Sequence, residues 1–213
     1  MRLRLLIFGA ALALISGCGS PTKSEPETAA ETPLDKIPAV YRARFETSKG
    51  DFVVEVTKAW APMGAARFHQ LVQEGFYGGA RFFRVLPGFV AQWGMSGDPA
   101  VQSVWSTRMI PDDPVKQSNF RGYITFAKNA PNTRTTQVFI NLGDNFKLDG
   151  LGFAPFGKVI SGIEVVDGLY SGYGEGAPRG QGPDQTQIAA QGVAYLTRQF
   201  PLLDFVRRAS IEQ

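Results

Sequence analysis

The sequence predicts a mainly-β domain of about eight strands with two longer helices, and three observations support this class. A chain of 213 residues is long enough for one well-packed domain and leaves little room for two. The 24 glycines and 14 prolines fall between short apolar stretches, which indicates many turns. Most of these stretches alternate apolar and polar residues or are rich in aromatic and β-branched side chains, as strands are.

The first elements are an expected β-hairpin and an expected helix. Residues 41–56 alternate apolar and polar side chains on both sides of Lys49-Gly50, which is typical of a hairpin. Pro62 suits the first turn of a helix, and Gly75 suits its end.

Residues 81–94 read RFFRVLPGFVAQWG, which predicts two short strands joined at Pro87-Gly88. Arg84 interrupts the apolar side chains of the first strand, and Gln92 interrupts those of the second. A guanidinium in apolar surroundings must be paired or hydrogen-bonded, because leaving it alone costs several kcal/mol. Arg84 therefore needs either a structural ion-pair partner or a functional role.

The second half of the chain alternates strands with loops and ends on a helix and a strand. Strands are expected at 122–127, 137–142, 156–162 and 203–211, with a short helical turn at 163–169. The Gly-rich segment 171–185 lacks the GxGxxG spacing of a phosphate-binding loop and is expected to be a surface loop. Asp184 is expected to cap a helix over 185–200. Its expected inward side chains are Ile188, Val193 and Leu196.

The N-terminal residues predict export and a membrane anchor. Residues 1–17 have a basic start and about a dozen apolar residues, the architecture of a signal peptide. They end in ISGC, which resembles the lipobox of bacterial lipoproteins, in which Cys18 would be lipidated and become the new N-terminus. The alternative is a secretory signal that happens to contain a cysteine. Residues 18–38 comprise this cysteine and a polar, Pro-rich tether, expected to be disordered with a reach on the order of 25 Å.

Net charge gives no indication of a nucleic-acid partner. Loss of Arg2 and Arg4 with the signal peptide lowers the basic residues from 22 to 20 against 19 acidic ones. The net charge then becomes +1 instead of +3, and no long basic stripe is left.

Three separated motifs resemble one known family. FFRVLPGFVAQWG resembles the cyclophilin signature FHRVIPGFMxQGG, and residues 126–142 and 147–159 resemble two further cyclophilin segments in the same order. The resemblance covers about residues 40–212, so residues 39–213 are expected to be a cyclophilin-like domain. It implies a closed eight-stranded antiparallel β-barrel capped by two α-helices and peptidyl-prolyl cis/trans isomerase activity that needs no cofactor or metal.

The resemblance also implies the site. Arg84 matches the catalytic arginine, and Gln92 matches the glutamine that orients it. The expected substrate-binding residues are Phe89, Val90, Ala127, Lys128, Gln137, Phe139, Leu148 and Phe153. Val90 replaces the family's Met, and Lys128 replaces an Asn. Phe153 stands for a pocket His only after one extra residue is allowed. Lys147 replaces a Trp that supports cyclosporin binding, so cyclosporin is expected to bind weakly.

Other reactive side chains are expected to have ordinary roles. His69 is the only histidine and has no Ser, Cys or metal-ligand partner at a useful spacing. Asp112 and Asp113 are adjacent carboxylates on a loop, expected to point apart into solvent.

Together these inferences predict a monomeric, lipid-anchored isomerase that acts on proline-containing exported polypeptides of the bacterial envelope. Gly19 lacks the Asp associated with inner-membrane retention, which favours an outer-membrane anchor facing the periplasm. Two alternatives remain open: a proline-peptide binding module or holdase without useful turnover, and an envelope scaffold in which the 185–200 helix recruits a partner.

Overall fold

The computed structural model describes residues 33–212, and these contain eight strands and four α-helices. The strands are β1 (Val40–Thr47), β2 (Gly50–Thr57), β3 (Arg84–Leu86), β4 (Val90–Trp93), β5 (Tyr123–Phe126), β6 (Val138–Asn141), β7 (Pro155–Ser161) and β8 (Val206–Glu212). The helices are α1 (Pro62–Gln73), α2 (Pro99–Ser106), α3 (Ile163–Asp167) and α4 (Gln185–Gln199), with short 3₁₀ turns η1 (Leu34–Lys36) and η2 (Phe146–Leu148). Within 33–212 no helix is long and apolar enough to span a membrane.

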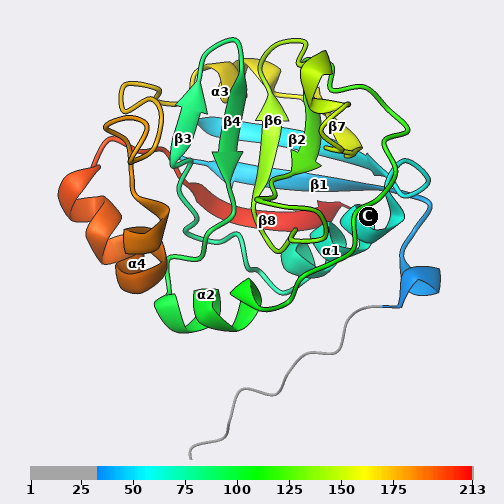
Figure 1. Cartoon of the computed structure of the whole chain (residues 1–213), viewed down its shortest axis with the longest axis horizontal. Coiled ribbons are helices and arrows are strands. Elements are labelled where there is room, and N and C mark those ends of the chain that lie inside the picture. Colours follow the sequence, from blue (N-terminus) through cyan, green and yellow to red (C-terminus); the bar gives the residue numbers. More distant parts are fainter. Residues whose placement is uncertain (1–32, 213) are drawn as a thin grey trace, which may run out of the picture. The chain divides into compact units, whose positions relative to one another are not determined.

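All eight strands belong to one antiparallel sheet, in the order β3-β4-β6-β5-β7-β2-β1-β8. The sheet curls strongly, so that β1, β2 and β8 cross the direction of β3, β4 and β6 (Figure 1). Its two ends meet at the segments that precede β3 and β8, where Arg81 and Phe205 form an isolated bridge. There Gly79 N donates to Val206 O at 2.8 Å, and Val206 N donates to Ala80 O at 2.9 Å. The predicted eight-stranded fold class is confirmed, but this bridge and these bonds replace a continuous ladder between β3 and β8, so the barrel is not fully closed.

The inward side chains of the strands form an aromatic core. Phe45 of β1 and Phe52 of β2 lie opposite each other and stack with ring centroids 5.0 Å apart. Trp93 of β4 meets both rings edge-on, at 5.7 and 6.1 Å, and Phe68 of α1 lies 5.9 Å from Phe45. Period-2 alternation thus directs one face of the curled sheet onto α1, as the hairpin and helix patterns predict.

The expectation of two capping helices is confirmed, but the second cap is the short helix α3 and not the longer helix α4. Phe68 of α1 and Val166 of α3 both belong to the main core, and the two helices lie at opposite ends of the sheet (Figure 1). Helix α4 instead packs against α2 and contributes to a separate cluster. That cluster comprises Phe83, Met95, Ile188, Tyr195, Leu196 and Leu203. Sequence periodicity shows that α4 has an apolar face but not which core that face contacts.

Two further differences between the predicted and the observed structure concern α4 and α2. Gly192 (φ 57°, ψ −139°) breaks the helical path of α4, and Val193 N donates to Gly97 O at 2.9 Å. The break rotates the following residues, so Val193, predicted inward, is 41% exposed. Helix α2 was not predicted, because only two of its eight residues are buried; Asp98 caps it by accepting from Ala100 N at 2.8 Å.

The packed chain begins slightly earlier than the predicted boundary at residue 39. Ile37 is 1% exposed within the main core, and Lys58 Nζ donates to its carbonyl oxygen at 2.7 Å. The residues just before position 39 are therefore part of the folded domain. The predicted signal peptide, Cys18 and residues 19–32 of the tether lie outside the described residues.

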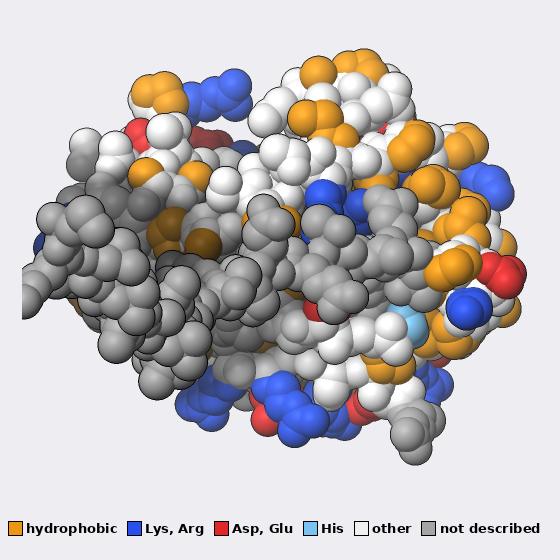
Figure 2. All heavy atoms as spheres, turned by 90° about the horizontal axis from the view of Figure 1, so that it is seen from below, with side chains coloured by type: hydrophobic (Ala, Val, Ile, Leu, Met, Phe, Trp, Pro, Cys, Tyr) orange, Lys and Arg blue, Asp and Glu red, His pale blue; other side chains and the backbone are white. Residues whose placement is uncertain are grey.

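Charges of both signs are mixed on the described surface. On the face shown in Figure 2, the basic side chains lie in separate groups beside acidic and hydrophobic ones. Several are paired across strands: Arg44 of β1, for example, contacts Asp51 of β2 at 3.3 Å and Glu212 of β8 at 2.8 Å.

Candidate active site

Arg84 lies on the outer face of the curled sheet and is not enclosed by the apolar side chains that surround it in the sequence. Its strand neighbour Val85 points into the main core, so strand alternation turns Arg84 outward. Gln92 is the register partner of Arg84 on β4, and Phe139 of β6 is in turn the partner of Gln92. The three side chains therefore stand side by side on one outer face across three adjacent strands.

The guanidinium of Arg84 is held by two partners. Nη1 donates to Gln92 Oε1 at 3.1 Å, while Nε and Nη2 donate to the two carboxylate oxygens of Glu175 at 2.6 and 2.8 Å. The ring of Phe89 lies beneath it, 5.5 Å from Cζ. Among the described residues no acceptor takes the remaining N–H groups, one on Nη1 and one on Nη2, so both are available to a bound molecule.

A pocket of about 390 Å³ opens beside Arg84. Its apolar wall is formed by Phe89, Val90, Ala127, Phe139, Leu148, Leu151 and Phe153. Phe139 is 4% exposed and meets Phe153 edge-on with centroids 5.8 Å apart. Phe153, the least secure of the sequence matches, thus stands in the pocket wall.

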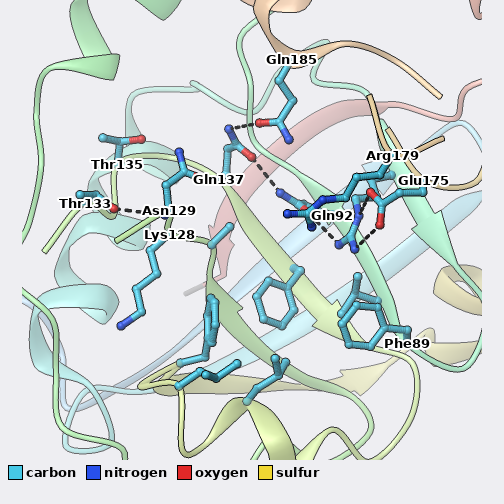
Figure 3. Close-up of a pocket in the computed structure, with 17 residues that line it drawn as sticks. Phe89, Gln92, Lys128, Asn129, Thr133, Thr135, Gln137, Glu175, Arg179 and Gln185 are labelled. Atoms are coloured by element: carbon cyan, nitrogen blue, oxygen red, sulfur yellow. Dashed lines mark hydrogen bonds and ion pairs between the residues drawn. The ribbon is translucent and has the colours of Figure 1, made fainter. Parts of the chain in front are cut away.

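Lys128 closes the other side of the pocket, opposite Glu175 and Arg179 (Figure 3). Its ammonium group does not project freely, since Nζ donates to Asp112 Oδ2 at 2.7 Å and lies 5.5 Å from the Phe153 ring. Burial raises the pKa of Asp112, but the hydrogen bonds from Lys128 and from the backbone N–H of Asn132 outweigh it and hold the pKa below its ordinary value.

The expectation that Asp112 and Asp113 are merely solvated is wrong. The side chain of Asp113 is 3% exposed and accepts from Met63 N at 3.0 Å and Gly64 N at 2.9 Å, in the first turn of α1. It also pairs with Arg134 at 3.0 Å. The loop between α2 and β5 therefore ties α1 to the pocket wall. Within 33–212 no group of three or more His, Cys, Asp or Glu side chains could hold a metal ion.

The structure brings all ten predicted site residues to the lining of this one pocket. It adds residues that sequence reasoning missed: Asn129, Thr133, Thr135, Leu151, Glu175, Arg179 and Gln185. Glu175 and Arg179 belong to segment 171–185, which is a loop as predicted but lines one side of the site. The one available signal was that Arg84 requires a partner, and spacing alone could not identify the acid that supplies it.

An amide chain continues from Arg84 along the same side of the pocket. Gln92 Nε2 donates to Gln137 Oε1 at 2.8 Å, and Gln137 Nε2 donates to Gln185 Oε1 at 3.0 Å (Figure 3). The hydrogen bonds from Arg84 hold the pKa of Glu175 below its ordinary value, so this carboxylate is ionised at neutral pH. The site thus combines oriented polar donors on one side with an apolar wall on another, an arrangement suited to charge reorganisation without bond cleavage.

Comparisons with known proteins agree with this geometry. Residues 42–189 match the family model described as cyclophilin type peptidyl-prolyl cis-trans isomerase/CLD. A peptidyl-prolyl cis-trans isomerase A from Dickeya dadantii is 35% identical over 126 residues, which cover 57% of this chain and 66% of that protein, just under two thirds. A peptidyl-prolyl cis-trans isomerase from Acinetobacter baylyi is 33% identical over 128 residues, which cover 58% of this chain and 68% of that protein.

A solved structure of a cyclophilin type peptidyl-prolyl cis-trans isomerase from Cryptosporidium parvum has the same fold. It superposes with a TM-score of 0.59 over 82% of this chain and 98% of that one, at 19% sequence identity. The family model covers well over half of the chain and includes every predicted pocket residue. The chain therefore belongs to the cyclophilin-type peptidyl-prolyl cis-trans isomerases.

Proposed function

We propose that this isomerase acts on X-Pro bonds of exported or envelope polypeptides and that Arg84 is its catalytic group. The observation that carries the proposal is the placement of a hydrogen-bonded guanidinium, with two free N–H groups, beside a pocket whose apolar wall and volume suit a proline side chain. Gln92 orients this guanidinium from the neighbouring strand.

The chemistry follows from the electronic structure of the peptide bond. Delocalisation of the nitrogen lone pair into the carbonyl gives a rotation barrier of about 18–20 kcal/mol. In the twisted transition state the lone pair is localised on the prolyl nitrogen, where it can accept a hydrogen bond. A donor from Arg84 aimed at that nitrogen would stabilise the twisted state more than either planar isomer, which lowers the barrier. The apolar wall would hold the ring while the carbonyl rotates.

The test is the isomerisation rate of an X-Pro peptide with the full chain and with Arg84→Ala, followed by NMR exchange. We expect the full chain to accelerate exchange and the variant to lose a factor of ten or more, which corresponds to about 1.4 kcal/mol of barrier lowering. Asp167→Asn is a suitable control, because it breaks a similar arginine–carboxylate pair, Arg121–Asp167, on the exposed surface outside the pocket.

The binding-module alternative has one specific observation in its favour. Glu175 occupies two N–H groups of Arg84 and partly neutralises the charge that catalysis would use. If the peptide binds in the pocket but neither protein accelerates exchange, this alternative replaces the catalytic proposal.

The envelope location rests on Cys18 and is tested separately. We expect the full chain, expressed in a bacterial host, to incorporate a fatty-acid label and to sediment with membranes. Cys18→Ala should lose the label and move to the supernatant. Equal labelling of both proteins would refute lipidation at Cys18, whereas an unlabelled, secreted full chain would identify an ordinary secretory signal.

A further inference from the structure

The segment that joins α3 to β8, residues 168–205, contributes three residues to the lining of the pocket, Glu175, Arg179 and Gln185. We propose that Glu175 and Gln185 are positioning residues that fix the orientation of Arg84 and Gln92 for isomerisation. The inference rests on the proposed catalytic role of Arg84 and assigns a function to a segment outside the three cyclophilin motifs.

Glu175 fixes the plane of the guanidinium. Its two oxygens take Nε and Nη2 in a bidentate pair at 2.6 and 2.8 Å, a geometry that defines the rotation of the planar group. The Arg84 side chain is 18% exposed and that of Glu175 is 30% exposed, so the pair is only partly solvated. With Gln92 on Nη1, the unused N–H groups of Arg84 are held in fixed directions.

Gln185 completes a chain of amide hydrogen bonds that begins at Arg84. Arg84 donates to Gln92 Oε1, so Gln92 presents its Nε2 to Gln137 Oε1, and Gln137 presents its Nε2 to Gln185 Oε1. Each amide in this chain donates in one direction only. Reversal of any one amide would place two donors or two acceptors face to face. Arg84 can only donate and therefore sets the direction of the chain, and Gln185, the first residue of α4, supplies the last acceptor.

The segment that carries these two residues is itself anchored. Glu175 O accepts from Gly182 N at 2.8 Å, and the Asp184 side chain accepts from Thr186 N at 2.7 Å, which caps α4. Ile188 and Leu196 of α4 belong to the same apolar cluster as Phe83, the chain neighbour of Arg84. Gln185 is therefore placed by the packed helix α4, and Glu175 is placed by the hydrogen bond within its own loop and by its pair with Arg84.

The pocket stays open with the pair formed. The space of about 390 Å³ is lined by Arg84 and Glu175 together with the apolar wall, so the pair forms without filling the pocket. This favours a positioning role over a plug, because a plug would fill the space that the proline ring requires.

The experiment measures turnover and binding separately. NMR exchange of an X-Pro peptide gives the isomerisation rate in the bound state and the Kd for the full chain, Glu175→Ala, Glu175→Gln and the control Asp167→Asn. We expect both Glu175 variants to lose about tenfold in bound-state rate, as misorientation of a catalytic group does, while Kd stays within about twofold. Asp167→Asn, which removes an exposed bidentate pair on α3, should match the wild type.

Gln185 supplies a second, independent variant pair. Gln185→Ala removes the acceptor at the end of the amide chain and should lower the bound-state rate about threefold. Gln185→Glu keeps an acceptor at the same place and should recover most of that loss. An equal effect of both substitutions would indicate that Gln185 acts only through α4 stability, which overturns its positioning role.

The pH dependence of the isomerisation rate distinguishes positioning by Glu175 from a general effect of the substitution on stability. The pKa of Glu175 lies below its ordinary value of 4.5, because Arg84 hydrogen-bonds to the ionised form. The wild-type rate should stay constant from neutral pH to below 4.5 and then fall as Glu175 is protonated, while Glu175→Gln should show no such fall. Circular dichroism at each pH identifies the range in which both proteins are folded.

The outcomes separate this inference from the function on which it rests. An active wild type with unchanged or faster Glu175 variants overturns the inference alone, and a faster variant would identify the segment as inhibitory. A change in Kd without a change in rate also overturns it, since Glu175 would then be a substrate contact. An inactive wild type overturns the catalytic proposal and the inference together.

Discussion

Asp113→Ala is the substitution for which the structure supplies the clearest magnitude. The Asp113 carboxylate is buried between the first turn of α1 and Arg134, with both partners' side chains 3% exposed. It accepts from Met63 N and Gly64 N, which otherwise have no capping side chain, since Ala61 stands at the N-cap. Two independent losses therefore follow from one deletion.

The first loss is that of a helix cap, worth about 1 kcal/mol. The second is the burial of Arg134 without this counter-ion, and removal of one partner from a buried pair costs about 3–5 kcal/mol. Arg134 keeps its hydrogen bond to the Pro111 carbonyl and its proximity to Asp112, 3.2 Å away, which places the second loss at the lower end of that range. The free energy of unfolding should thus fall by about 4 kcal/mol.

Equilibrium unfolding in urea measures this loss. With a slope of about 2 kcal/mol per molar urea, the midpoint should fall by about 2 M at unchanged slope. Asp167→Asn again provides the comparison, because its exposed pair with Arg121 should be worth about 1 kcal/mol or less. If Asp113→Ala costs no more than this control, the buried carboxylate does not tie α1 to the pocket wall and the reasoning fails.

Three further predictions concern pH, substrate binding and α4. Burial lowers the pKa of His69 below 6.5, so the unfolded state binds the proton more readily than the folded state. The free energy of unfolding should therefore decline as pH falls from 6.5 toward the folded-state pKa. Urea unfolding between pH 7 and 5 should show a smaller decline for His69→Gln. Phe153→Ala removes part of the apolar pocket wall and should raise KM for an X-Pro peptide about tenfold with little change in kcat; an unchanged KM would place the proline ring elsewhere. Gly192→Ala should lower the free energy of unfolding by about 3 kcal/mol, because φ is +57° and a Cβ would meet the Gly97 carbonyl oxygen. Gly75→Ala, with φ of +68° and open space around the Cβ, should cost only about 1 kcal/mol, and equal costs would show that strain alone matters at Gly192.

The fold could be predicted where local pattern and global packing agree. The hairpin of β1 and β2 and helix α1 follow from period-2 and period-3.6 patterns, because each has one face on the main core. Helix α2 escaped prediction, since its few buried residues leave almost no periodic signal. For α4 the inward position assigned to Val193 was wrong. The periodicity assumed an unbroken helix, but the positive φ of Gly192 rotates the residues that follow it about the helix axis.

The candidate site could be predicted where its residues lie on sheet strands or within the three motifs. Arg84, Gln92 and Phe139 are adjacent because strand register places them so. Glu175 and Gln185 could not be found this way, since they reach the pocket through an irregular segment and a tertiary contact of α4. The burial of Asp113 was missed for the same reason, as its partners lie 49 residues or more before it and 21 residues after it.

The location of the site on the outside of the barrel explains how an added segment can reach it. The main core lies on the inner face of the sheet, whereas Arg84, Gln92 and Phe139 stand on the outer face. Leu169 at the start of the segment between α3 and β8 belongs to the main core, and helix α4 packs through a second cluster with Phe83 and Met95. Residues 168–205 can therefore carry Glu175 to Arg84 without repacking the barrel. Because an outward arginine needs a partner wherever it is partly buried, the same segment satisfies Arg84 structurally and sets the direction in which its free N–H groups point.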